Sequence, residues 1–277
     1  MRHTSKPRPA LLRALGKQDP PLEIMIDGAC FARAEIYKHD SWAATARYEG
    51  AGRSVVCKFN RVQPIFGVPT SWLGRRLARR EALALCRLAG LPGVAPACGP
   101  IFSGGRWLEN AMGHEFIAAH PLARKERPGD DFFPALLALL REMHRRNLAY
   151  VDLHKRENIL VGDDGLPYLI DFQVSFGLWN ERMARSGLAQ AALRNLIQAD
   201  LYHLSKHIQH HRPDQAWLLG ETGRRPAWIE LHRMFAVHLR QLRRSVLVSL
   251  GVRGKKGRAT SEVFAEAAVR QELDQAA

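Results

Sequence analysis

Residues 150–173 constrain the fold of this 277-residue chain more than any other stretch of its sequence. Two short runs rich in β-branched, aromatic and other apolar residues, 159–161 and 168–170, flank the turn sequence Gly-Asp-Asp-Gly. Runs of this kind on either side of a turn are typical of a β-hairpin. We therefore expect a hairpin that begins directly after Asn158 and ends directly before Asp171.

Three polar residues flank this expected hairpin: Asp152 and Asn158 precede it, and Asp171 follows it. The hairpin would bring Asn158 and Asp171 to one end of a sheet, and their side-chain oxygens are the hard ligands that Mg²⁺ prefers. Asp152 is suited to orient a hydroxyl group and accept its proton. This combination suits phosphoryl transfer, in which a protein positions a hydroxyl and holds divalent metal on phosphates. We expect Asp152 as the catalytic base, with Asn158 and Asp171 as ligands of Mg²⁺ or Mn²⁺.

The same stretch resembles the catalytic loop and the D-F-G segment of the protein-kinase-like superfamily, because Y-V-D-L-H-K-R-E-N-I-L-V is followed by D-F-Q. It departs from the family pattern in three places. Five residues separate Asp152 from Asn158, where the family has four. Tyr150 and Val151 replace His-Arg, and Gln173 replaces the glycine. The resemblance implies a two-lobed α+β fold, with a small antiparallel-sheet N-lobe and a mainly helical C-lobe.

The resemblance also implies which residues bind ATP. Val-Val-Cys-Lys ends at Lys58 and resembles the V-A-I-K strand, whose lysine pairs with the phosphates and with a glutamate of the next helix. Glu81 is the only acid in the helix expected over residues 71–88. Glu115 and Ile117 fall in a segment that resembles the hinge, where backbone groups meet adenine. For Lys58 the alternative is the solvated face of an edge strand.

The chain divides into three expected parts: a flexible basic arm over residues 1–22, the N-lobe over 23–120 and the C-lobe over 121–277. Strands are expected at 34–38, 42–48, 54–59, 94–102 and 106–111, and a helix at 132–147. No G-x-G-x-x-G covers the phosphates, but the small residues Ser41, Ala43 and Ala44 at the first turn leave room for backbone approach.

Two further residues are given roles from their sequence context. His144 falls on the apolar face of the helix at 132–147, and we expect it to pack in the core. Asp200 is expected near the start of a helix. It either supports the catalytic loop as a structural acid or acts as a helix N-terminal charge.

The net charge of +14 and a pI of about 10.2 favour anionic partners. No recognition-helix, zinc-finger or ribonucleoprotein pattern accompanies the charge, so nucleic acid is not an expected partner. The four cysteines lack metal-site spacing, which favours a reducing compartment. We found neither an export signal nor an apolar block of membrane-spanning length, and expect a cytoplasmic protein. An amphipathic, arginine-rich helix expected at 228–250 either packs on the C-lobe or docks at the inner face of the membrane.

Asp152-Leu153-His154 resembles the D-L-H of small-molecule kinases, and no A-P-E triplet follows. The closest resemblance is to the bacterial kinases that phosphorylate heptose and other core sugars of lipopolysaccharide. It implies ATP-dependent transfer of the γ-phosphate to a hydroxyl of a membrane-associated glycolipid. Two alternatives are an atypical, RIO-like protein kinase and a pseudokinase that serves as a binding or scaffold module. The missing glycine-rich loop and the shifted Asn158 suggest the pseudokinase.

Overall fold

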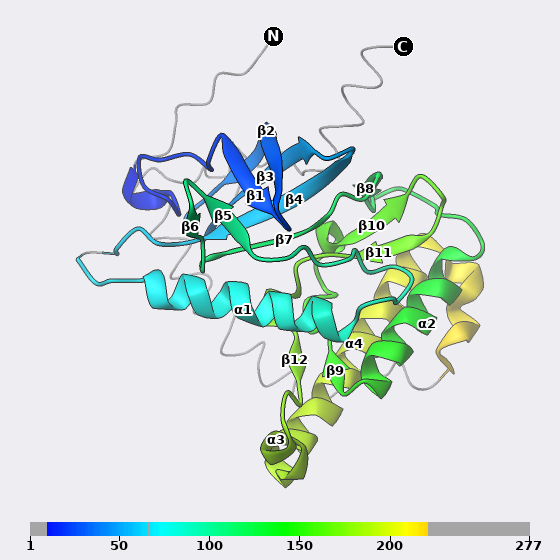
Figure 1. Ribbon diagram of the computed structural model, residues 1–277. Helices are drawn as coiled ribbons and strands as arrows, with labels where there is room; N and C mark the ends of the chain where they lie inside the picture. The colour runs from blue at the N-terminus through cyan, green and yellow to red at the C-terminus, as the bar shows by residue number, and fades with distance from the viewer. Residues whose placement is uncertain (1–9, 66, 221–277) are drawn as a thin grey trace, which may run out of the picture.

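The computed structural model describes residues 10–65 and 67–220, and in these residues the chain is an α+β protein. A curled seven-stranded antiparallel sheet lies on one side of a mainly helical part (Figure 1). The order of its strands is β6-β5-β1-β2-β3-β4-β7. Their bounds are β1 (Glu23–Ile26), β2 (Ala29–His39), β3 (Ala43–Gly50), β4 (Arg53–Asn60), β5 (Ile101–Ser103), β6 (Arg106–Trp107) and β7 (Ala111–Glu115).

The centre of the sheet is the antiparallel meander β2-β3-β4, which confirms the three strands expected at 34–38, 42–48 and 54–59. Its inner face forms a core of its own, built around the fully buried Phe31, Tyr48 and Phe59. Strand β1 was not predicted, because its four residues are too few to display an alternating pattern.

Residues 10–22, which we expected within a flexible arm, instead pack against the sheet. They begin with the 3-10 helix η1 (Ala10–Leu12), and Ala14 is fully buried. The Ala14 N–H donates to the Asp40 carbonyl at 2.7 Å, and the Ala14 carbonyl accepts from Val62 N–H at 3.0 Å. This segment therefore holds the turn between β2 and β3.

Helix α1 (Ser71–Arg87) agrees closely with the helix expected at 71–88. Its buried positions include Ala78, Ala84 and Leu85, which belong to the core of the helical part and not to the core of the sheet. Helix α1 runs beneath the sheet in Figure 1 and extends toward α2 (Phe132–Arg145). It consequently links the sheet to the rest of the molecule.

The helical part also carries the expected hairpin, β10 (Ile159–Gly162) with β11 (Pro167–Leu169), in which Leu160 lies opposite Tyr168. Strand β8 (Ala119–Pro121) adds to β10. Helix α2 confirms the helix expected at 132–147. The remaining elements are β9 (Leu148–Ala149), η2 (Arg156–Asn158), η3 (Phe172–Val174), β12 (Phe176–Gly177), α3 (Glu181–Arg185), α4 (Gly187–His211) and η4 (Pro213–Leu218).

The strand expected at 94–102 was wrong over most of its length, because only the last two of these residues belong to β5. Pro92, Pro96 and Pro100 lack the N–H that a ladder needs, so the segment makes only isolated bridges, at Val94 and Ala97. This segment joins α1 to β5.

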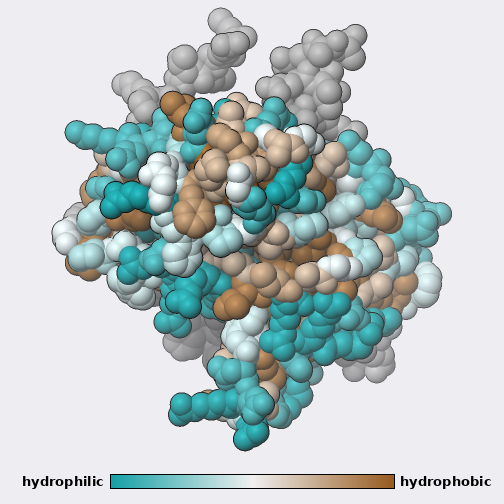
Figure 2. Space-filling model, in the orientation of Figure 1, coloured by the Kyte–Doolittle hydropathy of each residue, from teal (hydrophilic) through white to brown (hydrophobic). Residues whose placement is uncertain are grey.

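The amphipathic stretch at 228–250 lies outside the described residues. Within residues 10–65 and 67–220, no helix combines the length and apolar character needed to cross a bilayer. On the face drawn in Figure 2, apolar side chains of the described residues form small patches among hydrophilic ones.

Candidate active site

Lys58 and Glu81 meet between the sheet and α1. Lys58 is on β4, and its ammonium nitrogen lies 3.2 Å from Glu81 Oε2. Glu81 is buried, with 3% of its surface exposed, because it faces inward from α1. The alternative for Lys58, a lysine on a solvated strand face, is therefore wrong for this structure.

Asp171 reaches the same lysine from the helical part. Its Oδ1 accepts a hydrogen bond from Lys58 Nζ at 2.7 Å, although 113 positions separate the two residues in the chain. Asp171 has a φ of 60°, a left-handed conformation that Asp adopts more readily than most residues. Lys58 is therefore paired with two carboxylates from different elements.

The electrostatics of these three groups follow from burial and mutual charge. Burial alone would lower the pKa of Lys58, but the charges of Glu81 and Asp171 raise it above its ordinary value. Burial opposes ionisation of Asp171, yet the Lys58 charge and hydrogen bond keep its pKa below the usual range. Burial raises the pKa of Glu81 to about 7 against the pull of Lys58. The lysine stays charged, while burial favours the protonated form of the glutamate.

Asp152 and Asn158 form a second cluster on the adjoining loop. The Asn158 side-chain amide donates to Asp152 Oδ2 at 3.0 Å, and both residues are buried. The 3-10 turn η2 lies at the end of the segment that joins them and includes Asn158 itself. The extra residue therefore does not separate the acid from the amide.

Lys155 belongs to this second cluster and was not predicted. Its Nζ lies 2.7 Å from Asp152 Oδ2, and its charge also contributes to the lowered pKa of Asp171. Backbone bonding brings the two clusters together, because the Ile170 N–H donates to the Asn158 carbonyl at 3.2 Å. Lys155 lies between Asp152 and Asn158 in the sequence, and this position was a signal that could have singled it out.

The segment that precedes Asp152 is strained, and hydrogen bonds to α4 hold it in place. Val151 has a φ of 73°, which is costly for a β-branched residue. Both oxygens of Asp200 accept backbone hydrogen bonds, from Tyr150 N–H and Val151 N–H, each at 2.8 Å. His144 Nε2 lies 3.1 Å from the same carboxylate, in line with a packed structural histidine.

Asp200 lies in the interior of α4 (Gly187–His211) and is fully buried. The expectation that it sits near a helix start was wrong, and so was the alternative of a helix N-terminal charge. The structural-acid alternative is confirmed, since its carboxylate holds the loop that precedes Asp152.

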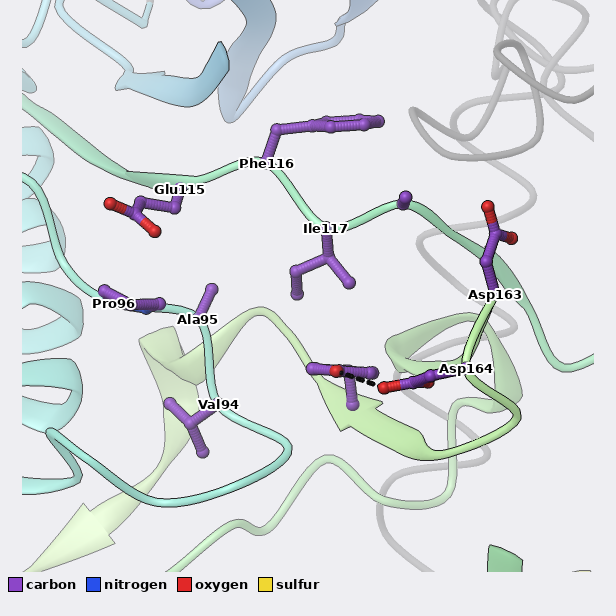
Figure 3. A pocket seen from close by; sticks show the side chains of 10 residues that line it. Val94, Ala95, Pro96, Glu115, Phe116, Ile117, Asp163 and Asp164 are labelled. Carbon is purple, nitrogen blue, oxygen red and sulfur yellow. Dashed lines mark hydrogen bonds between the residues drawn. The ribbon is translucent and has the colours of Figure 1, made fainter. Parts of the chain in front are cut away.

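Glu115 and Ile117 line a hollow of about 330 Å³ that does not include Lys58, Asp152 or Asp171. Figure 3 shows the Ile117 side chain pointing into this hollow and that of Phe116 pointing away from it. The other walls are the loop 94–96 and the turn of the β10-β11 hairpin.

The backbone groups expected to meet adenine are partly occupied. The Glu115 carbonyl lies 2.8 Å from His114 Nδ1, so that this nitrogen carries the hydrogen. The Glu115 N–H donates to the Pro96 carbonyl at 2.9 Å. Among the described residues, the Ile117 N–H and carbonyl have no hydrogen-bond partner, which leaves them open to a ligand.

The small residues of the turn between β2 and β3 suggested backbone N–H groups that are free to bind phosphates. The structure shows instead that N–H groups of this turn are already hydrogen-bonded. Asp40 Oδ1 accepts from Trp42 N–H at 2.7 Å and from Ala43 N–H at 2.9 Å. The Ser41 hydroxyl donates to the Leu12 carbonyl at 3.1 Å. The N–H groups of Trp42 and Ala43 are consequently not available to phosphates in this conformation.

The oxygen donors that remain suit a nucleotide-bound magnesium ion. The side-chain nitrogen of Asn158 donates to Asp152, so the side-chain oxygen of Asn158 is left to coordinate a metal. About a third of the Asp171 side chain is exposed. Within residues 10–65 and 67–220, no cluster of three or more His, Cys, Asp or Glu residues could hold a metal alone. Mg²⁺ commonly takes one or two protein oxygens together with phosphates, and two oxygens are what this site provides.

No protein-family model matches this chain, and no curated protein matches it. The functional assignment therefore depends on the geometry of the site and on the short motifs within it.

Proposed function

We propose that this protein is an ATP-dependent phosphotransferase with a two-lobed, protein-kinase-like fold. The observation that carries the proposal is the convergence of Lys58, Glu81 and Asp171 from β4, α1 and the end of the β10-β11 hairpin. Asp152 and Asn158 adjoin them through backbone bonding. A lysine with two carboxylates beside an acid and amide pair suits the binding of phosphates next to a proton acceptor.

Each residue has a role in the proposed reaction. Lys58, oriented by Glu81, binds the phosphates of ATP, and the open backbone groups of Ile117 bind adenine in the hollow that Glu115 also lines. Asn158 and Asp171 would hold Mg²⁺ or Mn²⁺, and the bound ion would neutralise phosphate charge.

Asp152 accepts the proton of the acceptor hydroxyl. The acceptor oxygen forms a bond to the γ-phosphorus, the bond from that phosphorus to the bridging oxygen breaks, and ADP leaves. Lys155 lies 2.7 Å from Asp152 and neutralises charge next to the transferring group.

The acceptor proposed is a hydroxyl of a membrane-associated glycolipid, such as a core sugar of lipopolysaccharide, reached from the cytoplasmic side. The D-L-H sequence that contains Asp152 and the net charge of +14 support this choice. Anionic lipid surfaces attract basic proteins, so a peripheral location is consistent with the charge.

Replacement of Asp152 tests the reaction. Asp152→Ala is expected to lower kcat by about 10² to 10⁴, the usual contribution of a positioned general base, with little change in nucleotide affinity. Glu157→Ala is the matched control, because it removes a carboxylate from the same loop and is expected to keep activity. Turnover should be measured as magnesium-dependent transfer from radiolabelled ATP to lipopolysaccharide and to casein.

The same assay distinguishes the alternatives. Equal turnover by Asp152→Ala and the unmodified protein would exclude Asp152 as the base. Transfer to casein alone would favour a RIO-like protein kinase. Nucleotide binding without transfer to either acceptor would favour a pseudokinase.

A further inference from the structure

Helix α4 is fixed against the loop that carries Asp152 at three successive points. Asp200 binds the backbone of Tyr150 and Val151, and His207 Nε2 lies 2.8 Å from the Leu153 carbonyl. Between these two points, the His203 ring lies 5.6 Å from the His154 ring. The exposed edge of α4 therefore has a fixed position relative to the proposed base.

Three rings follow one another along this edge. The His154 and His203 rings are inclined at 47°, and the Tyr202 and His203 rings, 5.3 Å apart, at 57°. Lys206 Nζ lies 4.8 Å from the centre of the Tyr202 ring. We refer to His154, Tyr202, His203 and Lys206 as the ring ledge.

The ring ledge begins at the proposed base and is accessible. His154 Nδ1 lies 3.4 Å from Asp152 Oδ1, and 48% of the His154 side chain is exposed. Lys206 is exposed, and Tyr202 and His203 are half-buried. Partial burial lowers the pKa of His203 to about 4, so its imidazole ring is uncharged at neutral pH. The face of an uncharged ring can pack against apolar groups.

We propose that the ring ledge binds the acceptor, and that this acceptor is a sugar with an anionic group next to the hydroxyl that is phosphorylated. This inference rests on the proposed function, because it takes Asp152 as the base. A sugar ring has an apolar C–H face that packs on aromatic rings, and its hydroxyl groups can bond to imidazole nitrogens. Lys206 supplies a cation for a phosphate or carboxylate substituent.

The ledge is less suited to a peptide acceptor. Peptides are recognised mainly through added strands, apolar grooves or clusters of arginine. The ring ledge instead presents inclined rings and a single cation, Lys206.

The test compares two probes: the phosphorylated core oligosaccharide of lipopolysaccharide and the same oligosaccharide after enzymatic dephosphorylation. We expect the unmodified protein to show at least a tenfold lower KM for the phosphorylated form. Lys206→Glu should abolish this preference, and His203→Ala should raise the KM for both forms. In each case the change should fall on the KM of the acceptor and not on that of ATP.

Arg194→Glu is the matched control, since it makes the same charge change at an exposed position of α4 outside the ring ledge. It should retain the preference for the phosphorylated probe. The melting temperature of each variant should be measured, so that loss of fold is not mistaken for loss of recognition. Retention of the full preference by Lys206→Glu would overturn the proposal, as would transfer to casein but to neither oligosaccharide.

Calorimetric titration of both probes separates this inference from the proposed function. The protein could transfer no phosphate, yet bind the phosphorylated probe more tightly and lose that preference in Lys206→Glu. This result would support acceptor binding by the ring ledge and exclude the phosphotransferase activity. If transfer to sugar occurs and Lys206→Glu and His203→Ala both have unchanged KM values, the phosphotransferase activity is supported and acceptor binding by the ring ledge is excluded.

Discussion

Burial raises the pKa of Glu81 to about 7 although Lys58 lies 3.2 Å away. An unfolded glutamate titrates near 4.5, so between these values the folded protein holds a proton that the unfolded chain releases. The stabilising contribution of that proton is complete below the unfolded pKa. It is lost as pH rises toward about 7.

We therefore expect the free energy of unfolding to fall, relative to that of Glu81→Gln, as pH rises from 5 to 7.5. The difference should change by about 1.4 kcal/mol per pH unit at most. Urea unfolding of both proteins across this range measures it. The other titrating groups are common to the two proteins, so parallel pH profiles would contradict a raised pKa for Glu81.

Among the contacts between α4 and the loop that carries Asp152, the Asp200 carboxylate is the one that binds two backbone groups. Asp200 is fully buried and accepts from two backbone N–H groups of a turn in which Val151 has a positive φ. Asp200→Ala leaves the buried Tyr150 N–H and the partly buried Val151 N–H without an acceptor, at a cost of about 1–3 kcal/mol for each.

We expect Asp200→Ala to lose about 2–5 kcal/mol in urea unfolding, and Asp200→Asn, which keeps one oxygen, to lose less. Asp131→Ala is the control, because Asp131 is exposed and makes no side-chain cap to α2, so its loss should stay within about 0.5 kcal/mol. Similar losses in the Asp200→Ala and Asp131→Ala variants would show that the turn does not depend on Asp200.

The elements that could be predicted are those whose pattern repeats along the chain. Helices α1 and α2 have apolar positions at helical spacing, and the β10-β11 hairpin combines β-branched runs with a glycine turn. The position of Asp200 within α4 could not be predicted, because that helix mixes polar and apolar residues on all sides and its start is not marked by the sequence near Asp200.

The residues of the candidate site that could be predicted are those that lie in short sequence motifs. Lys58 and Asp171 were named from short segments, and their pairing follows once β4 and the hairpin face one another. The bonds of the β2-β3 turn to residues 10–15 were not predicted, because they depend on tertiary contacts that leave no periodic signal. Lys155 was missed although it lies within the same motif as Asp152.

The sheet and the helical part have separate cores, and the hydrogen bond between Lys58 and Asp171 bridges the two parts. A nucleotide bound between these side chains would contact both parts in the folded protein and neither in the unfolded chain. Such a ligand stabilises the fold by about 2.7 kcal/mol at one hundred times its Kd, which corresponds to several degrees in Tm.

We expect ATP with Mg²⁺ to raise Tm more than ATP with EDTA does, and Asp171→Asn to lose the magnesium-dependent part of that rise. Asp131→Asn makes the same chemical change at an exposed site and should keep it. Differential scanning fluorimetry over a magnesium titration provides the measurement. Superimposed titration curves for the unmodified protein and Asp171→Asn would exclude Asp171 as a metal ligand. A Tm that ATP leaves unchanged in every protein would exclude nucleotide binding between the two cores.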